Sequence, residues 1–398
     1  MTSTETHSNS EPAATRTRNA AQCAIALREL GQATVAELSA RTGLSRPTVE
    51  VGLDAMTGRG VVSILGDLTA GGRGAGRPAR IYAFRARAGY LAAVDVGPHR
   101  VRVALADLSG GIAGWLDRQT DADAVGPNRM TGVRRAIDEC LREAGVAASE
   151  LVGMGVAVTG MVGLDGRLIV SRNLPDWEGV DVAAHLGRVY DCPVTIENDI
   201  RMAALAEHRL GAARLADDVL YLFAGHRVSM ALIIDGKLRH GRHSAAGEMG
   251  GIAFSMPVDD QHDQLRWRTA ASGEGVFRLA ADGDEESLEE VRQFTAGLAT
   301  GVAVAAMTVD PDLIVVGGGL SSAGGVLLDP LREAVCAAIP VPVSPTIIAS
   351  ELGSEAVALG TLVHAFGSVS TSLYGAEGLP EPTIDVDDAR SRAREAAA

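Results

Sequence analysis

The sequence predicts an α/β protein in two parts, a small N-terminal winged helix-turn-helix followed by a larger body. In the first part, apolar residues recur at helical spacing and then alternate along two short strands. In the second part, buried strands alternate with amphipathic helices, which is typical of an α/β domain with a ligand cleft between lobes. The charge divides at the same place, because residues 1–88 hold 11 Arg and 7 acidic residues, a net of +4, whereas the remainder has a net charge of −18. A basic head on an acidic body indicates that only the head meets a polyanion.

The 398 residues are long enough for two or three domains. We expect a mobile tail over 1–14, the winged helix-turn-helix over 15–87, the body over 88–372 and a second mobile tail over 373–398. No stretch resembles the roughly 18–20 apolar residues of a membrane span. The N-terminus is polar and lacks the apolar core of a signal peptide. We therefore expect a cytoplasmic protein with no membrane partner.

Two short capped helices in the head predict a helix-turn-helix. Thr34-Val35-Ala36-Glu37 matches a capping box, and the helix that it opens ends near Gly43. Ser45 caps the next helix, which carries Arg46 and Thr48 in its first turn. Small polar and Arg side chains at such an N-terminus can reach base edges and phosphates, so Ser45, Arg46 and Thr48 are predicted DNA contacts. The same pattern would also suit a small helical interaction module.

The segment that follows favours DNA binding over that module. Residues 61–65 and 80–84 are predicted strands, and the loop between them, 71–78, is rich in Gly and Arg. A wing with such a tip suits a narrow minor groove, where the negative potential attracts Arg. We therefore add Arg73 and Arg77 to the predicted DNA contacts. A Gly-Arg linker without a partner is the alternative.

Five motifs of the body, taken in order behind the head, resemble the ROK family of bacterial repressors and sugar kinases over residues 15–370. The motifs are Asn173-Leu174-Pro175-Asp176-Trp177, Ile196-Glu197-Asn198-Asp199, Ala203-Ala204-Leu205-Ala206-Glu207, Gly247-Glu248-Met249-Gly250 and Gly317-Gly318-Gly319. The resemblance implies an actin-like (ribonuclease H-like) two-lobed sugar-kinase fold.

The resemblance also implies an effector site. In the family, the Asp that corresponds to Asp199 is the general base that takes a proton from a sugar hydroxyl, a task that suits a carboxylate at a strand end. By the same resemblance Asn198, Asp199 and Glu248 would hold a sugar, with Asn173 as a weaker candidate. Asn198 and Asp199 could equally cap the helix that follows them, and the two roles are compatible.

The chain departs from the family at both phosphate turns. The family's Asp-x-Gly-Gly-Thr is Asp95-Val96-Gly97-Pro98-His99 here, and Pro98 removes an N–H donor from a turn that binds phosphate through its N–H groups. The family's Gly-Thr-Gly-x-Gly is replaced by Gly225-His226-Arg227. Because phosphoryl transfer depends on positioning, we expect no enzymatic activity and no cofactor, with Asp199 a vestigial general-base position.

A structural zinc site of the family is also missing. Its one His and three Cys positions fall on Gly251, Asp259, Gln261 and Arg266, so no metal is expected. The chain has four scattered cysteines without a Cys-x-x-Cys pair, for which we expect buried free thiols: Cys23, Cys140, Cys192 and Cys336.

Two arginines bear on the effector. Arg201 follows Asn198-Asp199 where the family usually has a small amide, and Arg268 stands where it has a Glu. Guanidinium groups at these positions could favour an anionic effector such as a sugar phosphate. Alternatively, both arginines form ion pairs within this acidic body.

Together these patterns predict a sequence-specific DNA-binding transcriptional regulator of the repressor type. Its partners would be a double-stranded DNA operator, a sugar or sugar-phosphate effector, and further copies of the chain in a homodimer or dimer of dimers. Two alternatives stay open. One is an active ATP-dependent sugar kinase with a fused DNA-binding head, and the other is a DNA-binding protein that responds to no effector.

Overall fold

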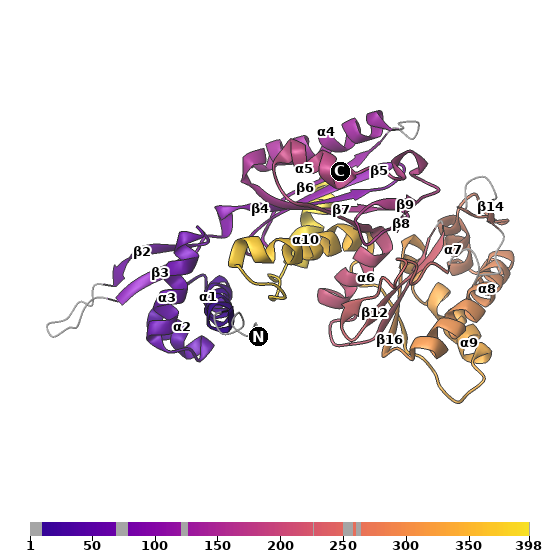
Figure 1. Cartoon of the computed structure of the whole chain (residues 1–398). Coiled ribbons are helices and arrows are strands. Elements are labelled where there is room, and N and C mark those ends of the chain that lie inside the picture. The colour runs from indigo at the N-terminus through magenta and orange to yellow at the C-terminus, as the bar shows by residue number, and fades with distance from the viewer. Residues whose placement is uncertain are drawn as a thin grey trace, which may run out of the picture.

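The computed structural model describes residues 10–68, 79–120, 126–225, 227–249, 258–259 and 264–397. It shows a small N-terminal head at one end of a larger body, and two lobes within the body (Figure 1). The first lobe adjoins the head, and the second lobe lies beyond it.

The head contains three helices and a three-stranded antiparallel sheet of order β1-β3-β2. Its elements are α1 (Ser10–Leu30), β1 (Gln32–Thr34), α2 (Val35–Thr42), α3 (Arg46–Gly58), β2 (Val62–Leu68), β3 (Ala79–Phe84) and η1 (Ala86–Ala88). The predicted caps are confirmed: Thr34 and Glu37 form the capping box of α2, and the Ser45 hydroxyl accepts a hydrogen bond at the start of α3. The turn between these helices uses Gly43 at φ 73°, a conformation that favours glycine.

The first lobe contains a five-stranded sheet of order β10-β7-β4-β5-β6, in which β4, β7 and β10 are parallel. Its elements are β4 (Tyr90–Val96), β5 (Arg100–Asp107), β6 (Ile112–Gln119), α4 (Pro127–Ala144), η2 (Ala148–Glu150), β7 (Leu151–Val158), β8 (Met161–Val162), β9 (Leu168–Val170), η3 (Pro175–Trp177), α5 (Val182–Tyr190) and β10 (Val194–Asn198). Helices α4 and α5 cover one face of the sheet (Figure 1).

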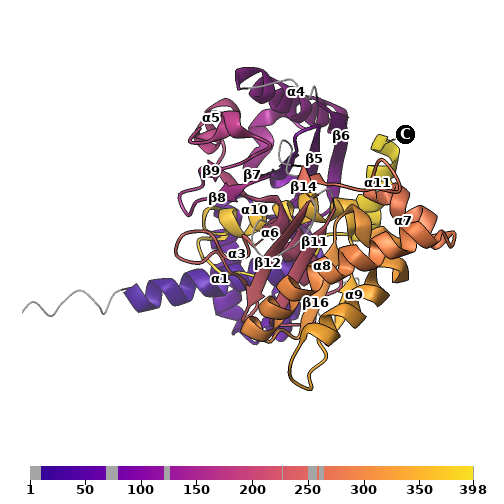
Figure 2. The same cartoon turned by 90° about the vertical axis from the view of Figure 1, so that its right-hand side faces the viewer.

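The second lobe contains a sheet of order β13-β12-β11-β16-β17, with helices α7, α8 and α9 in front of it (Figure 2). Its elements are α6 (Asp199–Arg209), β11 (Val219–Ala224), β12 (Val228–Ile234), β13 (Lys237–Leu238), β14 (Val258–Asp259), β15 (Gln264–Leu265), α7 (Gly273–Ala281), α8 (Glu285–Val309), β16 (Leu313–Gly317), η4 (Gly319–Ala323), α9 (Gly325–Ala338), β17 (Ile347–Ala349) and η5 (Gly353–Glu355). Strands alternating with helices in two lobes agree with the predicted α/β class.

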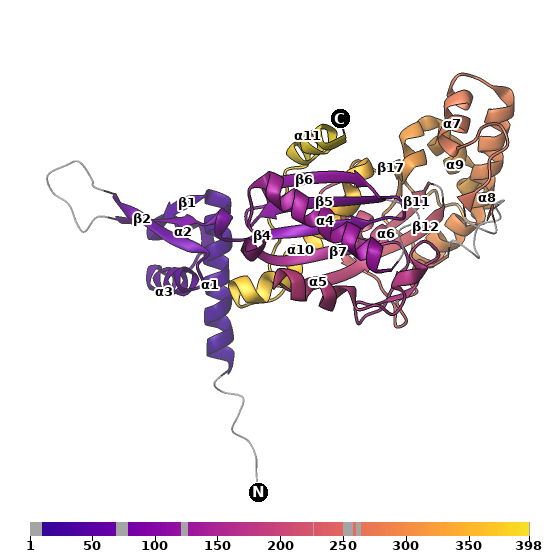
Figure 3. The ribbon, with the colours of Figure 1, turned by 90° about the horizontal axis from the view of Figure 1, so that it is seen from above.

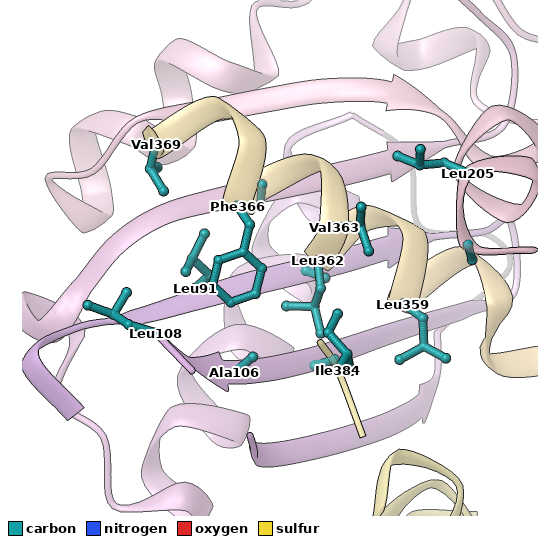
Figure 4. Close-up of a cluster of buried hydrophobic side chains, with 14 of the residues drawn as sticks. Leu91, Ala106, Leu108, Leu205, Leu359, Leu362, Val363, Phe366, Val369 and Ile384 are labelled. Carbon is teal, nitrogen blue, oxygen red and sulfur yellow. The ribbon is translucent and has the colours of Figure 1, made fainter. Parts of the chain in front are cut away.

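Helix α10 (Ala356–Tyr374) lies on the other face of the first sheet and packs on α6. The two helices approach closely at Gly360, where a Cβ atom would lie 1.8 Å from the carbonyl oxygen of Met202. Leu359, Leu362 and Phe366 of α10 point at the strands that carry Leu91 and Ala106 (Figure 4).

Helix α10 also corrects the expectation that no segment has membrane-span character. Within the described part of the chain, Gly353–Tyr374 is the one helix whose length and apolar composition would allow it to cross a membrane. However, 61% of its apolar window is buried inside the protein. A central helix that is covered by a sheet and another helix needs apolar residues on most of its faces. The packing therefore accounts for its composition.

The C-terminal segment corrects a second expectation, that of a mobile tail over 373–398, because residues 373–397 are ordered on the body. Helix α11 (Val386–Ala397) packs along β6 (Figure 3), and Ile384 and Ala389 are only 2% and 0% exposed. So few buried apolar residues produce no helical periodicity, which is why the sequence pattern did not predict this contact. At the other end, α1 begins at Ser10, inside the predicted tail over 1–14.

The last residues of α10 and the segment behind it hold the head on the body. The Arg59 guanidinium donates to the carbonyl of Ser372 at 3.0 Å, and Arg28 donates to the carbonyl of Pro380 at 2.9 Å. Gly375 ends α10 at φ 79°, and a Cβ atom there would lie 2.6 Å from Arg59 Nη2. We call residues 372–397 the C-terminal strap, since they run from the head across the first lobe.

Candidate functional site

The predicted effector residues Asn198 and Asp199 lie where β10 ends and α6 begins. The Asn198 Oδ1 atom accepts a hydrogen bond from the Arg201 backbone N–H at 2.9 Å, so Asn198 does cap α6. Its Nδ2 atom donates to the carbonyl of Gly160 at 2.9 Å, which ties the cap to the loop after β7. The carboxyl ends of parallel strands meet at one sheet edge, and this edge faces the second lobe (Figure 1).

Asp199 is held rigidly at this edge. Its carboxylate accepts hydrogen bonds from the Thr159 hydroxyl at 2.8 Å and from the Ile200 backbone N–H at 2.9 Å. Burial raises the pKa of Asp199, and the Arg227 guanidinium is the strongest influence against this rise. Burial also raises the pKa of Glu248, opposed by Arg201 and reinforced by Asp199. The structure therefore brings Asp199 and Glu248 within electrostatic reach of each other.

Asn173 lies less directly at this edge. It is half-buried in the segment between β9 and η3. This segment is tied to the site because the Ser171 hydroxyl donates to the Thr159 carbonyl at 2.6 Å and accepts from the Leu174 N–H at 3.0 Å. None of the hydrogen bonds among the described residues joins the Asn173 side chain to Asp199. Its role as an effector contact stays a prediction.

Arg201 is neutralised within the body, as the second alternative expected. It is 2% exposed, lies 3.2 Å from a carboxylate oxygen of Glu197 and donates to the carbonyl of Ser244 at 2.5 Å. Glu197 also receives a hydrogen bond from His240 at 2.6 Å. Although burial raises the pKa of Glu197, the hydrogen bonds from His240 and the Asn198 N–H hold it below its ordinary value.

Arg268 also has partners within the body. Its side chain is 66% exposed, donates to Gln293 at 2.8 Å and lies 3.7 Å from Glu290. Neither arginine therefore offers a free guanidinium to an effector. Arg227, in the turn between β11 and β12, is a better candidate, because its Nε atom is buried and has no hydrogen-bond partner among the described residues. From the sequence, Arg227 was considered only as part of a replaced phosphate turn and not as an effector contact.

The first phosphate turn is occupied by side chains of the protein itself. Asp95, at the end of β4, lies 3.6 Å from Arg102 of the neighbouring strand, and burial raises the pKa of Asp95 to about 7. Arg102 also binds Asp117 at 2.9 Å and the carbonyl of Ser354 at 2.9 Å. The Gly97 N–H donates to the carbonyl of Arg100 and closes a hairpin. The backbone N–H of Gly97 and the carboxylate of Asp95 therefore both interact with groups of the protein itself.

The other glycine turns are filled in a similar way. The Gly225 N–H donates to the carbonyl of Arg227 at 3.0 Å, and His226 between them lies outside the described residues. A Cβ atom at Gly317 would lie 2.0 Å from the Tyr221 hydroxyl, and one at Gly318 would lie 2.3 Å from the carbonyl of Ala224. Close packing alone therefore requires glycine at 317 and 318.

The predicted DNA contacts of α3 lie at its exposed N-terminus. Ser45 and Arg46 are exposed, and Thr48 is half-buried. The hydroxyls of Ser45 and Thr48 are 2.7 Å apart and hydrogen bonded to each other, so both take part in the helix cap. Arg46 is not restrained in this way. Arg73 and Arg77 lie outside the described residues.

The described residues contain no group of three His, Cys, Asp or Glu side chains placed to hold a metal ion. Of the positions that correspond to the family's zinc ligands, Gly251 and Gln261 lie outside those residues. The cysteines are free, and three of them are buried, but Cys336 is exposed, which corrects our expectation for that thiol. Burial raises the pKa of Cys23 to about 11, so this thiol stays protonated.

Comparisons with known proteins agree with this geometry. The model of the ROK family matches residues 91–264 and 251–366. The xylose repressor of Bacillus subtilis is 25% identical over 347 residues, which cover 82% of this chain and 88% of the repressor. The glucokinase of Halalkalibacterium halodurans is 26% identical over 275 residues, which cover 60% of this chain and 83% of that enzyme.

Among solved structures, a ROK family transcriptional regulator homologous to the E. coli MLC protein superposes with a TM-score of 0.69 at 18% identity. The superposition covers 90% of this chain and 97% of that one, so the shared fold includes much more than the body. The family model alone spans well over half of the sequence. This chain therefore belongs to the ROK family.

Proposed function

We propose that this protein is a sequence-specific DNA-binding transcriptional repressor whose body senses a sugar or sugar phosphate and transfers no phosphate. The observation that carries the proposal is the exposed, capped N-terminus of α3 in a head of three helices and three strands. This arrangement supports a winged helix-turn-helix, a motif in which the second helix of the turn enters the major groove. The similarity to a xylose repressor supports the same function.

The loss of kinase activity is supported by the pairing of Asp95 with Arg102. A nucleotide phosphate bound beside Asp95 would need the N–H groups of its turn, and Pro98 has none while Gly97 donates to Arg100. Phosphoryl transfer requires a metal ion and several donors in fixed positions. Arg102 already supplies a fixed positive charge to Asp95 and Asp117.

Effector sensing is supported by the residues at the start of α6. Asp199 and Glu248 are acceptors that suit sugar hydroxyls, and Asn198 and Asn173 lie on adjoining segments. Effector binding between the lobes would alter DNA binding only if it distinguished two conformations of the head relative to the body. We place the protein in the cytoplasm, where its operator is, and expect a homodimer or dimer of dimers across a symmetric site.

A test begins with in vitro selection of DNA by the full-length protein, followed by fluorescence anisotropy of the selected site during titration with sugars and sugar phosphates. The proposal expects a palindromic site that is released by one compound. Asp199→Asn should abolish that release and leave the affinity for DNA unchanged. If no DNA site is enriched, the proposal that this protein is a DNA-binding regulator is wrong. Enrichment of a site that no compound releases would overturn effector sensing alone.

The second candidate, a sugar kinase with a DNA-binding head, is favoured by one observation. Asp199 is retained with a raised pKa, as a general base requires. Coupled assays of ATP turnover with a panel of hexoses test it. Turnover that Asp199→Asn abolishes would establish the kinase.

A further inference from the structure

An open groove of about 420 Å³ lies in the head between α3, the start of α2 and strand β3. Four charged side chains from two elements line it: Arg46, Glu50 and Asp54 from α3, and Arg80 from β3. All four are exposed. The remaining walls come from residues 34–36 and from Ala79 and Tyr82.

Within the described part of the chain, these four charges have no partner. Among the ion pairs and hydrogen bonds within the described residues, none joins the side chain of Arg46, Glu50, Asp54 or Arg80 to a partner. Arg41, another exposed charge of the head, is by contrast paired with Glu29 at 2.7 Å. The groove therefore presents two cations and two carboxylates to whatever occupies it.

The spacing sets the order of these groups along the helix. Arg46, Glu50 and Asp54 are four residues apart, so they form one stripe in which neighbours are separated by about 6 Å along the axis. A helix in the major groove presents one of its faces to the base edges, so side chains at this spacing would contact different positions along the groove.

The carboxylates determine what the groove can accept. DNA phosphates alone would not suit this groove, because the negatively charged carboxylates of Glu50 and Asp54 would repel them. Carboxylates facing the major groove instead accept hydrogen bonds from exocyclic amino groups, and the preferred partner of Glu is the N4 amino group of cytosine. Arg46 and Arg80 flank them and provide the positive charge that phosphates require.

We infer that Glu50 is a specificity-determining residue that recognises a cytosine in each operator half-site. Glu50 lies in the second turn of α3, whereas Asp54 lies a turn further along, and residues near the N-terminus of a recognition helix make the base contacts. The inference rests on the proposed DNA-binding function. Beyond that function, it specifies which base is recognised and which side chain recognises it.

Glu50→Gln tests the inference, because Gln prefers adenine, which it contacts through N6 and N7. Selection of DNA by the wild type should give a half-site with one strongly preferred cytosine. Selection by Glu50→Gln should replace that cytosine with adenine, with discrimination of about tenfold or more, and leave the other positions unchanged. Glu50→Ala should bind all four bases there with similar affinity.

The matched control is Glu29→Gln, which removes the same charge from an exposed site on α1. It should change no base preference, because Glu29 lies outside the groove and is paired with Arg41. A wild-type site that Glu50→Gln leaves unchanged would overturn this inference and leave the DNA-binding function intact. The absence of any selected site for the wild type would instead overturn the DNA-binding function, and the inference with it.

Discussion

The groove of the head and the interior of the body use charge in opposite ways. In the head, Arg46, Glu50 and Arg80 surround an open groove without partners among the described residues. In the body, Arg102 and Arg201 are fixed by carboxylates and by backbone carbonyls. Free charges are available to a ligand, whereas buried and paired charges mainly hold the protein in one arrangement. The comparison separates the residues that we expect to affect binding from those that we expect to affect stability.

The largest effect is expected for Arg201→Ala. Removing this buried guanidinium leaves Glu197 buried with a reduced set of partners, and loss of one member of such a pair costs about 3–5 kcal/mol. Chemical denaturation measures the change in the free energy of unfolding. Arg268→Ala is the control and should cost less than about 1 kcal/mol, because this guanidinium is 66% exposed and its partner Glu290 keeps hydrogen bonds from the backbone and from Thr269. Equal losses for both variants would contradict the distinction between buried and exposed pairs.

Arg46→Ala should come next and should act on DNA binding alone. Loss of a contact to a base or phosphate should weaken operator binding by about 1–3 kcal/mol, with no change in the free energy of unfolding, because Arg46 is exposed and unpaired. Anisotropy titration and thermal unfolding measure the two quantities. Arg41→Ala removes an exposed arginine of α2 as a control. An unaltered affinity in Arg46→Ala would show that the N-terminus of α3 does not contact the operator through this side chain.

The buried carboxyl group of Asp95 should make the stability of the body depend on pH. Its pKa in the folded protein, about 7, lies above the ordinary value of 3.8. The folded state therefore holds this proton more tightly than the unfolded state, and its contribution to stability is lost as pH rises from about 4 to about 7. The stability of the wild type relative to Asp95→Asn should therefore fall across that window, as chemical denaturation at a series of pH values would measure. A constant difference between pH 4 and 8 would show that Asp95 titrates normally.

The smallest effect is expected at the junction of the head and the body. Arg59→Ala removes the hydrogen bond to the Ser372 carbonyl, so the free energy of unfolding should fall by about 0.5–1.5 kcal/mol. The operator affinity should change little, while release by the effector should weaken because the head is held less firmly. Calorimetry and the anisotropy titration measure these. Release that is as complete as in the wild type would exclude Arg59 from the coupling.

Local features of this fold were predicted from the sequence with most success. The caps at Thr34 and Ser45 depend on neighbouring residues and were correctly predicted, as was the turn from β10 into α6. Features that join distant segments were missed. The pairing of Asp95 with Arg102 requires the register of β4 on β5, and the groove requires β3 beside α3. The strap was missed because Ile384 and Ala389 give too short a pattern to indicate a packed face.

The C-terminal strap is also expected to limit which DNA-binding heads can be exchanged between such proteins by recombination. The head contacts the body through Ser372, Gly375 and Pro380, which are encoded some 300 residues after the helices that they touch. A recombination event that transferred residues 10–88 alone would bring in a head without its matching strap. The transferred head would also have to match the turn at Gly375, where φ is 79° and an added Cβ would lie 2.6 Å from Arg59 Nη2. Heads and straps are therefore expected to be inherited together, although they lie at opposite ends of the chain.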